Sequence, residues 1–229
     1  MTRTRIKICG LMREQDVDAA VAAGVDAVGF VLYASSPRAV TPQRAGELAS
    51  RLPPFVTPVL LFVNEDAAAA NAALAAVPGA IAQFHGDESP QQCRESSGAG
   101  RYRFVRAARI PLGAAGAEFD LVKYASDFSH AQAILLDAHV DGYGGGGKAF
   151  DWSLLPPAVD AHLVLSGGLT PANVGEGIRQ LRTRAKTLSV DVSSGVEADA
   201  GDGKTGKGIK DADKIRDFVA AVRAADIAS

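Results

Sequence analysis

The sequence predicts an α/β fold, a single (β/α)8 (TIM) barrel that spans residues 1–229 as one domain. Strand-like and helix-like segments alternate from end to end in eight units with no break in composition, which is the pattern of a closed parallel barrel. The length of 229 residues lies within the range of about 200 to 250 that is common for such barrels. The alternative is a doubly wound open sheet, but such sheets more often have five or six strands.

The expected elements follow one another in a regular order. Short apolar runs predict eight strands, at residues 5–9, 27–31, 56–63, 80–84, 102–107, 133–137, 163–165 and 188–192. Helical patterns predict the connections, at residues 14–23, 42–51, 65–77, from 89 onward, 118–125, 171–181 and 211–224, with a short turn at 152–155. Ser89 is an expected N-cap because Pro90 follows at the first helical position.

Alternation within the strands predicts which side chains face the barrel interior. In the first strand Ile6 and Ile8 share one face, and Lys7 and Cys9 share the other with Arg5. The strands at 133–137 and 188–192 alternate in the same way and carry Asp137 and Asp191. The apolar faces suit the surrounding helices, so the polar faces must point inward. Barrel enzymes build their active sites at the carboxyl ends of the strands.

Composition narrows the class of protein. The formal charge is −2 and the pI is about 6.1, so nothing indicates a nucleic acid or an anionic membrane as a partner. Two cysteines, Cys9 and Cys93, cannot form a disulfide framework and are typical of a reducing compartment. No apolar run approaches the roughly 20 residues of a membrane span, and no signal peptide is evident. We therefore expect a cytoplasmic protein.

Seven short motifs, each placed at the end of a predicted element, carry a resemblance to a known family. They are KICG (7–10), SPRAVT (36–41), QFHGDE (83–88), LLD (135–137), GKAFDW (147–152), LSGGLTP (165–171) and VDVSSGVE (190–197). Each motif alone is weak, but their order along essentially the whole chain resembles phosphoribosylanthranilate isomerase of tryptophan biosynthesis.

The resemblance implies an Amadori rearrangement of a small phosphosugar–anthranilate substrate. N-(5-phosphoribosyl)anthranilate would become 1-(2-carboxyphenylamino)-1-deoxyribulose 5-phosphate. No metal or organic cofactor is implied, because the imine of the substrate is the electron sink. The resemblance makes Cys9 the general base, which takes the proton from C2, and Asp137 the general acid, which opens the ring. The alternatives are a small buried core residue for Cys9 and a turn-capping residue for Asp137.

Further substrate contacts are implied at the same mouth of the barrel. Arg38 would hold the anthranilate carboxylate, which suits the planar fork of a guanidinium, although an arginine beside a proline is commonly a surface residue. Gln83 and His85 share a strand face and suit a sugar or anthranilate contact, although His85 could be a core histidine. Strand alternation also predicts that Lys7 pairs with Asp191 beneath or beside Cys9, because a closed barrel makes the first and last strands neighbours; the alternative is that Lys7 is a structural residue below the site, bonded to another group.

The phosphate site is expected in the loops after the last two strands, at Gly167, Gly168, Ser194 and Gly195. Glycine lets the backbone approach a phosphate closely, and exposed N–H groups supply the donors. Barrels often build a phosphate site in these two loops. The alternative is that these are ordinary turn residues.

Two nucleotide-binding patterns are decoys, and two features depart from the family. Residues 142–147 match G-x-G-x-x-G, but no long helix opens there. A Walker loop ending at 203–205 would need glycine at position 198, which is Ala198. The family usually has threonine at the position of Gly146. Residues 200–208 form a longer connection than usual, which its Gly, Asp and Lys content predicts to be a mobile, solvated loop; the alternative is that Lys204 or Lys207 reaches the phosphate.

Two other functions remain compatible with the sequence. One is the related histidine-pathway isomerase, which performs the same rearrangement with two aspartates on two half-barrels. Here the first strand carries Cys9, and no half-barrel repeat is visible. The other is a phosphate-binding barrel without catalysis.

Overall fold

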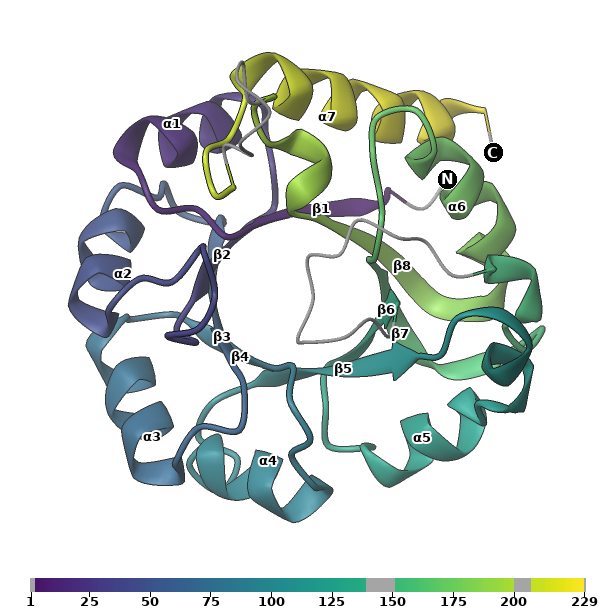
Figure 1. Ribbon diagram of the computed structural model, residues 1–229, viewed down its shortest axis with the longest axis horizontal. Helices are drawn as coiled ribbons and strands as arrows, with labels where there is room; N and C mark the ends of the chain where they lie inside the picture. The colour runs from purple at the N-terminus through teal and green to yellow at the C-terminus, as the bar shows by residue number, and fades with distance from the viewer. Residues whose placement is uncertain (1–2, 139–150, 200–206, 229) are drawn as a thin grey trace.

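The eight predicted strands form a closed barrel in the computed structural model, which describes residues 3–138, 151–199 and 207–228. The strands run parallel in the order β1 to β8, and β8 pairs with β1 to close the ring. The helices form an outer layer around this ring (Figure 1). The predicted (β/α)8 fold is therefore confirmed, and the open sheet is excluded.

The elements alternate as expected along the chain. The strands are β1 Arg5–Cys9, β2 Ala27–Val31, β3 Thr57–Phe62, β4 Ile81–Phe84, β5 Phe104–Ile110, β6 Ala133–Ala138, β7 Val159–Leu165 and β8 Ala185–Val192. The α-helices are α1 Glu14–Ala22, α2 Pro42–Ala49, α3 Ala67–Ala76, α4 Pro90–Ser96, α5 Leu121–Asp127, α6 Val174–Leu181 and α7 Ala212–Ile227. Four short 3-10 helices are η1 Gly113–Glu118, η2 Trp152–Leu154, η3 Arg182–Arg184 and η4 Ser194–Val196.

Strand alternation divides the apolar residues into two layers, as predicted. Ile6 and Ile8 belong to the large core between the strands and the helices, and so do the alternating residues of β6 and β8. Cys9 faces the other way and packs in a small cluster with Val31, Leu61 and Val63. A period of two residues therefore decides whether a side chain stabilises the helix layer or reaches the interior.

Three strands differ from their predicted bounds by two residues or more. β8 begins at Ala185, three residues before the predicted start at 188. β5 is displaced toward its carboxyl end and reaches Ile110, because it pairs with β6 as far as Ala138. β7 begins at Val159, four residues before the predicted start at 163. Its first part contains the exposed Asp160 and His162 and a register shift, so these residues lack the apolar pattern that predicts a strand.

Helix ends also differ. α6 starts at Val174 because residues 171–173 form a turn, in which Asn173 accepts a hydrogen bond from Thr170 N (2.8 Å). α7 starts after its N-cap, Asp211, and continues to Ile227. The helix predicted at 118–125 is α5, which follows η1. The glycine-loop decoy at 142–147, Gly146 and Lys204 lie outside the described residues.

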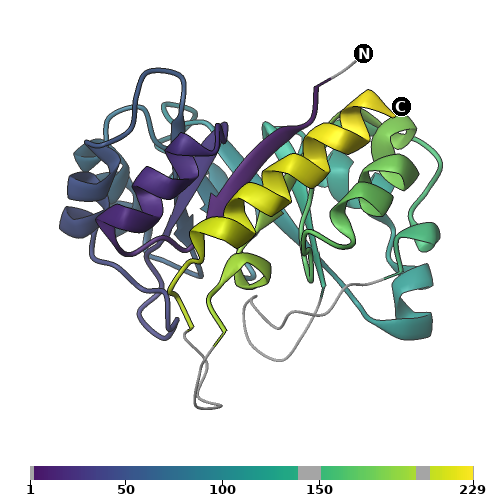
Figure 2. The ribbon, with the colours of Figure 1, turned by 90° about the horizontal axis from the view of Figure 1, so that it is seen from above.

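The two ends of the chain meet at the amino-terminal end of the barrel (Figure 2). Asp226 of α7 accepts hydrogen bonds from Thr4 N (2.9 Å), Thr4 Oγ1 (2.6 Å) and Arg182 Nη2 (2.5 Å). These contacts explain why α7 extends beyond its predicted end. No helix among the described residues is long and apolar enough to cross a membrane.

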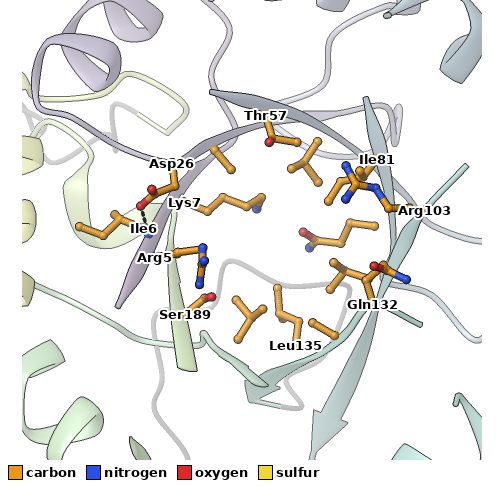
Figure 3. Close-up of a pocket in the computed structure, with 16 residues that line it drawn as sticks. Arg5, Ile6, Lys7, Asp26, Thr57, Ile81, Arg103, Gln132, Leu135 and Ser189 are labelled. Atoms are coloured by element: carbon orange, nitrogen blue, oxygen red, sulfur yellow. Dashed lines mark hydrogen bonds between the residues drawn. The ribbon is translucent and has the colours of Figure 1, made fainter. Parts of the chain in front are cut away.

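The barrel interior is not completely filled by side chains. A cavity of about 250 Å³ lies at its amino-terminal end, where the first residues of the strands form the wall (Figure 3). Arg5, Arg103 and Ser189 lie around this cavity, and Lys7 extends into it from β1. Lys7 and Gln83, two of the predicted substrate contacts, therefore line this cavity, whereas Cys9, His85 and Asp137 lie at the carboxyl ends of β1, β4 and β6.

Candidate active site

Lys7 and Asp191 form a buried ion pair inside the barrel, as strand alternation predicted. The two residues are register partners on β1 and β8, and Lys7 Nζ lies 2.8 Å from Asp191 Oδ1. Gly29 of β2 provides the space, because a Cβ at this position would lie 2.8 Å from Cys9 Sγ and 3.1 Å from Lys7 Nζ. The ammonium and the thiol therefore fill one small volume between β1 and β2.

The surroundings of Cys9 act on its pKa in opposite directions. Burial raises the pKa, the cations of Lys7 and Lys210 lower it, and the carboxylate of Asp191 raises it. The net result is a pKa above the ordinary value for a thiol. Lys7 itself has a raised pKa, because burial would lower it but Asp191 and Cys9 more than compensate. Lys7 is therefore protonated at neutral pH.

Asp137 is held in a hydrogen-bonded chain with the two polar residues of β4. His85 Nε2 lies 2.9 Å from Asp137 Oδ2, and Gln83 Nε2 lies 3.1 Å from His85 Nδ1. All three side chains are buried. Asp137 Oδ1 accepts a hydrogen bond from the N–H of Ala138 (2.9 Å). Both carboxylate oxygens are thus oriented, and His85 contacts the predicted acid.

A second buried ion pair fixes the loop that carries His85. Arg106 Nη1 lies 2.9 Å from Glu88 Oε2, and the same guanidinium donates to the carbonyl oxygens of Phe84 and Gly86. Glu88 accepts hydrogen bonds from Gly86 N (2.9 Å) and Asn64 N (2.7 Å). The backbone on either side of His85 is therefore anchored to β5 and to the end of β3.

Arg38 makes a bidentate ion pair with Glu197. Its Nε lies 2.6 Å from Glu197 Oε1, and its Nη2 lies 3.0 Å from Oε2. Lys210 Nζ lies 3.1 Å from the same Oε1 and also donates to Ser193 O (3.0 Å). Burial raises the pKa of Glu197, but hydrogen bonds and charge from Arg38 and Lys210 lower it by more. The net pKa of Glu197 therefore lies below its ordinary value. Arg38 is a buried, partnered residue and not the free surface arginine of the alternative interpretation.

The loops after β7 and β8 pack closely together. Gly167 and Gly168 have positive φ values of 76° and 65°. A Cβ on Gly195 would lie 1.9 Å from Leu169 O, so only glycine permits this approach. The backbone N–H groups of these glycines and of Ser194 donate to no acceptor among the described residues.

The predicted residues fall into four groups. Lys7, Cys9 and Asp191 form one group, Arg38 with its partner Glu197 forms the second, Gln83, His85 and Asp137 form the third, and the glycine loops form the fourth. Gly167 joins the last two, because its Cβ position lies 2.8 Å from Asp137 Oδ1. Among the described residues, no group of three His, Cys, Asp or Glu side chains could hold a metal ion.

Four residues with a place in this site had no assigned role in the sequence analysis: Gly29, Glu88, Glu197 and Lys210. Glu88 and Glu197 are each the last residue of a motif that follows an apolar strand. This position is the only feature of the local sequence that could have indicated a role for them. Lys210 follows a long connection and has no motif, so only the folded chain brings it to Glu197.

Three comparisons describe what the chain resembles. Residues 6–221 match the family model of N-(5'-phosphoribosyl)anthranilate (PRA) isomerase. A protein of that name from Methylibium petroleiphilum is 59% identical over 224 residues, which cover 98% of this chain and 96% of that protein. The crystal structure of phosphoribosyl anthranilate isomerase from Thermotoga maritima has a TM-score of 0.79 and 37% identity, covering 96% and 99% of the two chains.

A second similar structure holds a ligand. It is phosphoribosyl anthranilate isomerase in complex with reduced 1-(o-carboxyphenylamino)-1-deoxyribulose 5-phosphate. Its TM-score is 0.73 and its identity 32%, with coverage of 96% of this chain and 99% of that one. The carboxylate, secondary amine and phosphate of this ligand are groups that an arginine, acid–base residues and a glycine-rich loop can bind.

Proposed function

Because this chain belongs to the N-(5'-phosphoribosyl)anthranilate isomerase family, we propose that Cys9 and Asp137 are the base and acid of the reaction it catalyses. That reaction converts N-(5'-phosphoribosyl)anthranilate into 1-(2-carboxyphenylamino)-1-deoxyribulose 5-phosphate, an intramolecular isomerisation in tryptophan biosynthesis. The observation that carries the assignment is the pairing of Asp137 with His85 at the carboxyl end of the barrel, together with the Lys7–Asp191 pair beside Cys9.

In the first step, Asp137 donates its proton to the furanose ring oxygen of the substrate. The bond between C1 and the ring oxygen breaks, and the nitrogen lone pair forms the C1=N bond of a protonated Schiff base. In the second step, the Cys9 thiolate removes the proton from C2. The electrons of the C2–H bond move to the imine nitrogen, and the resulting enolamine tautomerises to the aminoketose. All atoms remain in the substrate, so the residues only move protons.

The chain from Gln83 to Asp137 can hold either proton state of the acid. With Asp137 ionised, Gln83 donates to His85 Nδ1 and His85 Nε2–H donates to the carboxylate. With Asp137 protonated, its hydroxyl donates to Nε2, and Nδ1–H donates to the Gln83 amide oxygen after that amide has rotated. In both arrangements the ring carries one N–H, so the two differ in the tautomer of His85. We propose that His85 and Gln83 orient Asp137 toward the ring oxygen.

The raised pKa of Cys9 means that the thiol is protonated in the empty site at neutral pH. The protonated Schiff base of the opened substrate is a cation next to C2, and it would favour the thiolate when it forms. Lys7 adds a fixed positive charge below the sulfur. We propose that these two cations together make Cys9 a base at the step where it is needed.

We assign the ends of the substrate to two other parts of the mouth. The phosphate would bind to the backbone N–H groups of Gly167, Gly168, Ser194 and Gly195, which have no acceptor among the described residues. Arg38 would bind the anthranilate carboxylate. We also propose a cytoplasmic location and no nucleic-acid or membrane partner, which the near-neutral charge and the two free thiols support.

The test is isomerisation by the purified chain, produced in a host without its own isomerase. The fluorescence of the anthranilate substrate should decay as the product forms. A Cys9→Ser/Asp137→Asn double variant controls for contaminating activity. Unchanged fluorescence with the folded wild-type chain would refute the activity, and equal decay with the double variant would remove both residues from the mechanism.

A further inference from the structure

Arg38, Glu197 and Lys210 form a buried cluster of two cations and one carboxylate, which we call the Arg38 cluster. The three residues are 7%, 8% and 5% exposed. Glu197 Oε1 accepts from both cations, at 2.6 Å from Arg38 Nε and 3.1 Å from Lys210 Nζ. The formal charge of the Arg38 cluster is therefore +1, whereas an Arg38–Glu197 pair alone would be neutral.

The edge of Arg38 that Glu197 occupies determines which edge remains available. A guanidinium has five N–H donors in one plane. Glu197 takes the side formed by Nε and Nη2. Nη1 donates to no described residue, so the end of the fork, formed by Nη1 and Nη2, can accept a second planar carboxylate with two parallel hydrogen bonds.

Lys210 places a second positive charge at the Glu197 oxygen that Arg38 Nε contacts. Its ammonium is completely buried, and it is fixed by Ser193 O (3.0 Å) as well as by Glu197. Burial lowers the pKa of Lys210, while Glu197 and Cys9 oppose that effect. A buried cation of this kind is costly unless it offsets a carboxylate, and the carboxylate that it offsets is the one that Arg38 already binds.

We propose that Glu197 and Lys210 are positioning residues for carboxylate recognition by Arg38: Glu197 fixes the guanidinium with its free edge outward, and Lys210 restores the positive charge that Glu197 cancels. This inference rests on the proposed function, in which Arg38 binds the anthranilate carboxylate. It assigns a role to two residues that never touch the substrate, and it explains why one arginine can bind two carboxylates at once.

The experiment measures binding without catalysis. The dissociation constants of the reduced product analogue and of the same molecule without its carboxylate are measured by calorimetry. The constant of the molecule without the carboxylate, divided by that of the analogue, gives a ratio that reports carboxylate recognition. Lys210→Met should reduce this ratio about tenfold, a change that corresponds to about 1.4 kcal/mol. Lys210→Arg should restore most of it. Lys214→Met is the matched control, because Lys214 donates to Glu197 O and Asp199 but not to the Glu197 carboxylate.

Glu197→Gln separates positioning from simple charge. This variant removes a negative charge beside Arg38, so electrostatics alone predicts tighter binding of the carboxylate. The positioning role predicts a smaller ratio, because the guanidinium loses its bidentate anchor. A Glu197→Gln/Lys210→Met double variant keeps the cluster at +1 and avoids an unpaired buried lysine, so it provides the same test if the single variant is unstable.

The outcomes are distinct. A reduced ratio in Lys210→Met and in either Glu197 variant, with an unchanged ratio in Lys214→Met, supports the proposal. An unchanged or larger ratio in the folded Glu197 variants, or an equal loss in Lys214→Met, overturns it. If the wild-type chain neither isomerises the substrate nor binds the analogue, the proposed function itself fails, and this is visible before any variant is compared.

Discussion

The ammonium of Lys7 lies 2.8 Å from Asp191 Oδ1, between facing positions of the first and last strands of the barrel. Both side chains are at most 10% exposed, so each charge depends on the other. Cys9 is next to Lys7 on the same inward face, and the cation of Lys7 lowers the pKa of its thiol while Asp191 raises it. One ion pair thus affects both the stability of the barrel and the proposed base.

Lys7→Met should move the rising limb of the pH profile of kcat/KM to higher pH. Removing the cation leaves burial and the negative charge of Asp191, which both raise the pKa of Cys9. The unpaired Asp191 should also lower the free energy of unfolding by roughly 3 to 5 kcal/mol. The pH profile is measured by steady-state kinetics across pH, and the free energy of unfolding is measured by denaturant titration.

The control for this prediction is Lys186→Met, which removes an exposed lysine from β8, the strand that carries Asp191. Adding Asp191→Asn to Lys7→Met should recover part of the lost stability, because no unpaired charge remains. A pH profile that does not move in Lys7→Met would show that Lys7 has no influence on the base.

Cys9→Ser and Asp137→Asn should each reduce kcat at least about 100-fold, with a smaller change in KM. Steady-state kinetics on the anthranilate substrate gives both constants. Cys93→Ser is the matched control, because Cys93 is a buried thiol on α4, in the core between the strands and the helices and not in the barrel interior. A kcat close to that of the wild type in either site variant would exclude that residue.

Gly167→Ala should impair catalysis through Asp137. A Cβ at Gly167 would lie 2.8 Å from Asp137 Oδ1 and 2.7 Å from Ala138 N, so the carboxylate must shift. We expect kcat to fall at least about tenfold, since displacement of a catalytic group by about 1 Å can cost two orders of magnitude.

Gly79→Ala is the comparison for this effect, because its φ of 78° matches the 76° of Gly167 and a Cβ there would meet nothing within 4 Å. Both variants carry similar backbone strain, so Gly79→Ala measures the stability cost of that strain alone, and only Gly167→Ala should lose activity. Equal kcat values for the two variants would contradict the contact with Asp137.

Asp226→Asn should destabilise the protein without affecting kcat. Asp226 joins α7 to Thr4 and Arg182 at the end of the barrel away from the proposed site, and losing these charged hydrogen bonds should cost about 1.5 to 3 kcal/mol. The pKa of Asp226 lies below its ordinary value, because the hydrogen bonds with Thr4 and Arg182 outweigh the opposing effect of burial.

The sign of the pH dependence follows from that lowered pKa. The stabilisation is present above the unfolded pKa of about 3.9 and is lost as the pH falls through the lower folded value. The difference in thermal unfolding between Asp226→Asn and wild type should therefore be full above about pH 4 and shrink only as the pH falls below that value toward the folded pKa, while the exposed Asp217→Asn should match wild type throughout. A constant difference across this range would argue against an ionic role for Asp226.

The sequence by itself determined the barrel, its inward and outward strand faces, and the Lys7–Asp191 pair. These depend on a local period of two residues and on closure of eight parallel strands, which together fix register neighbours. Only the tertiary structure decided that Glu197 and Lys210 surround Arg38, that His85 contacts Asp137, and that β7 begins at the polar residues near Val159. These contacts join different loops or depend on pairing with a neighbouring strand, so their energies arise between segments and leave no periodic trace within any one of them.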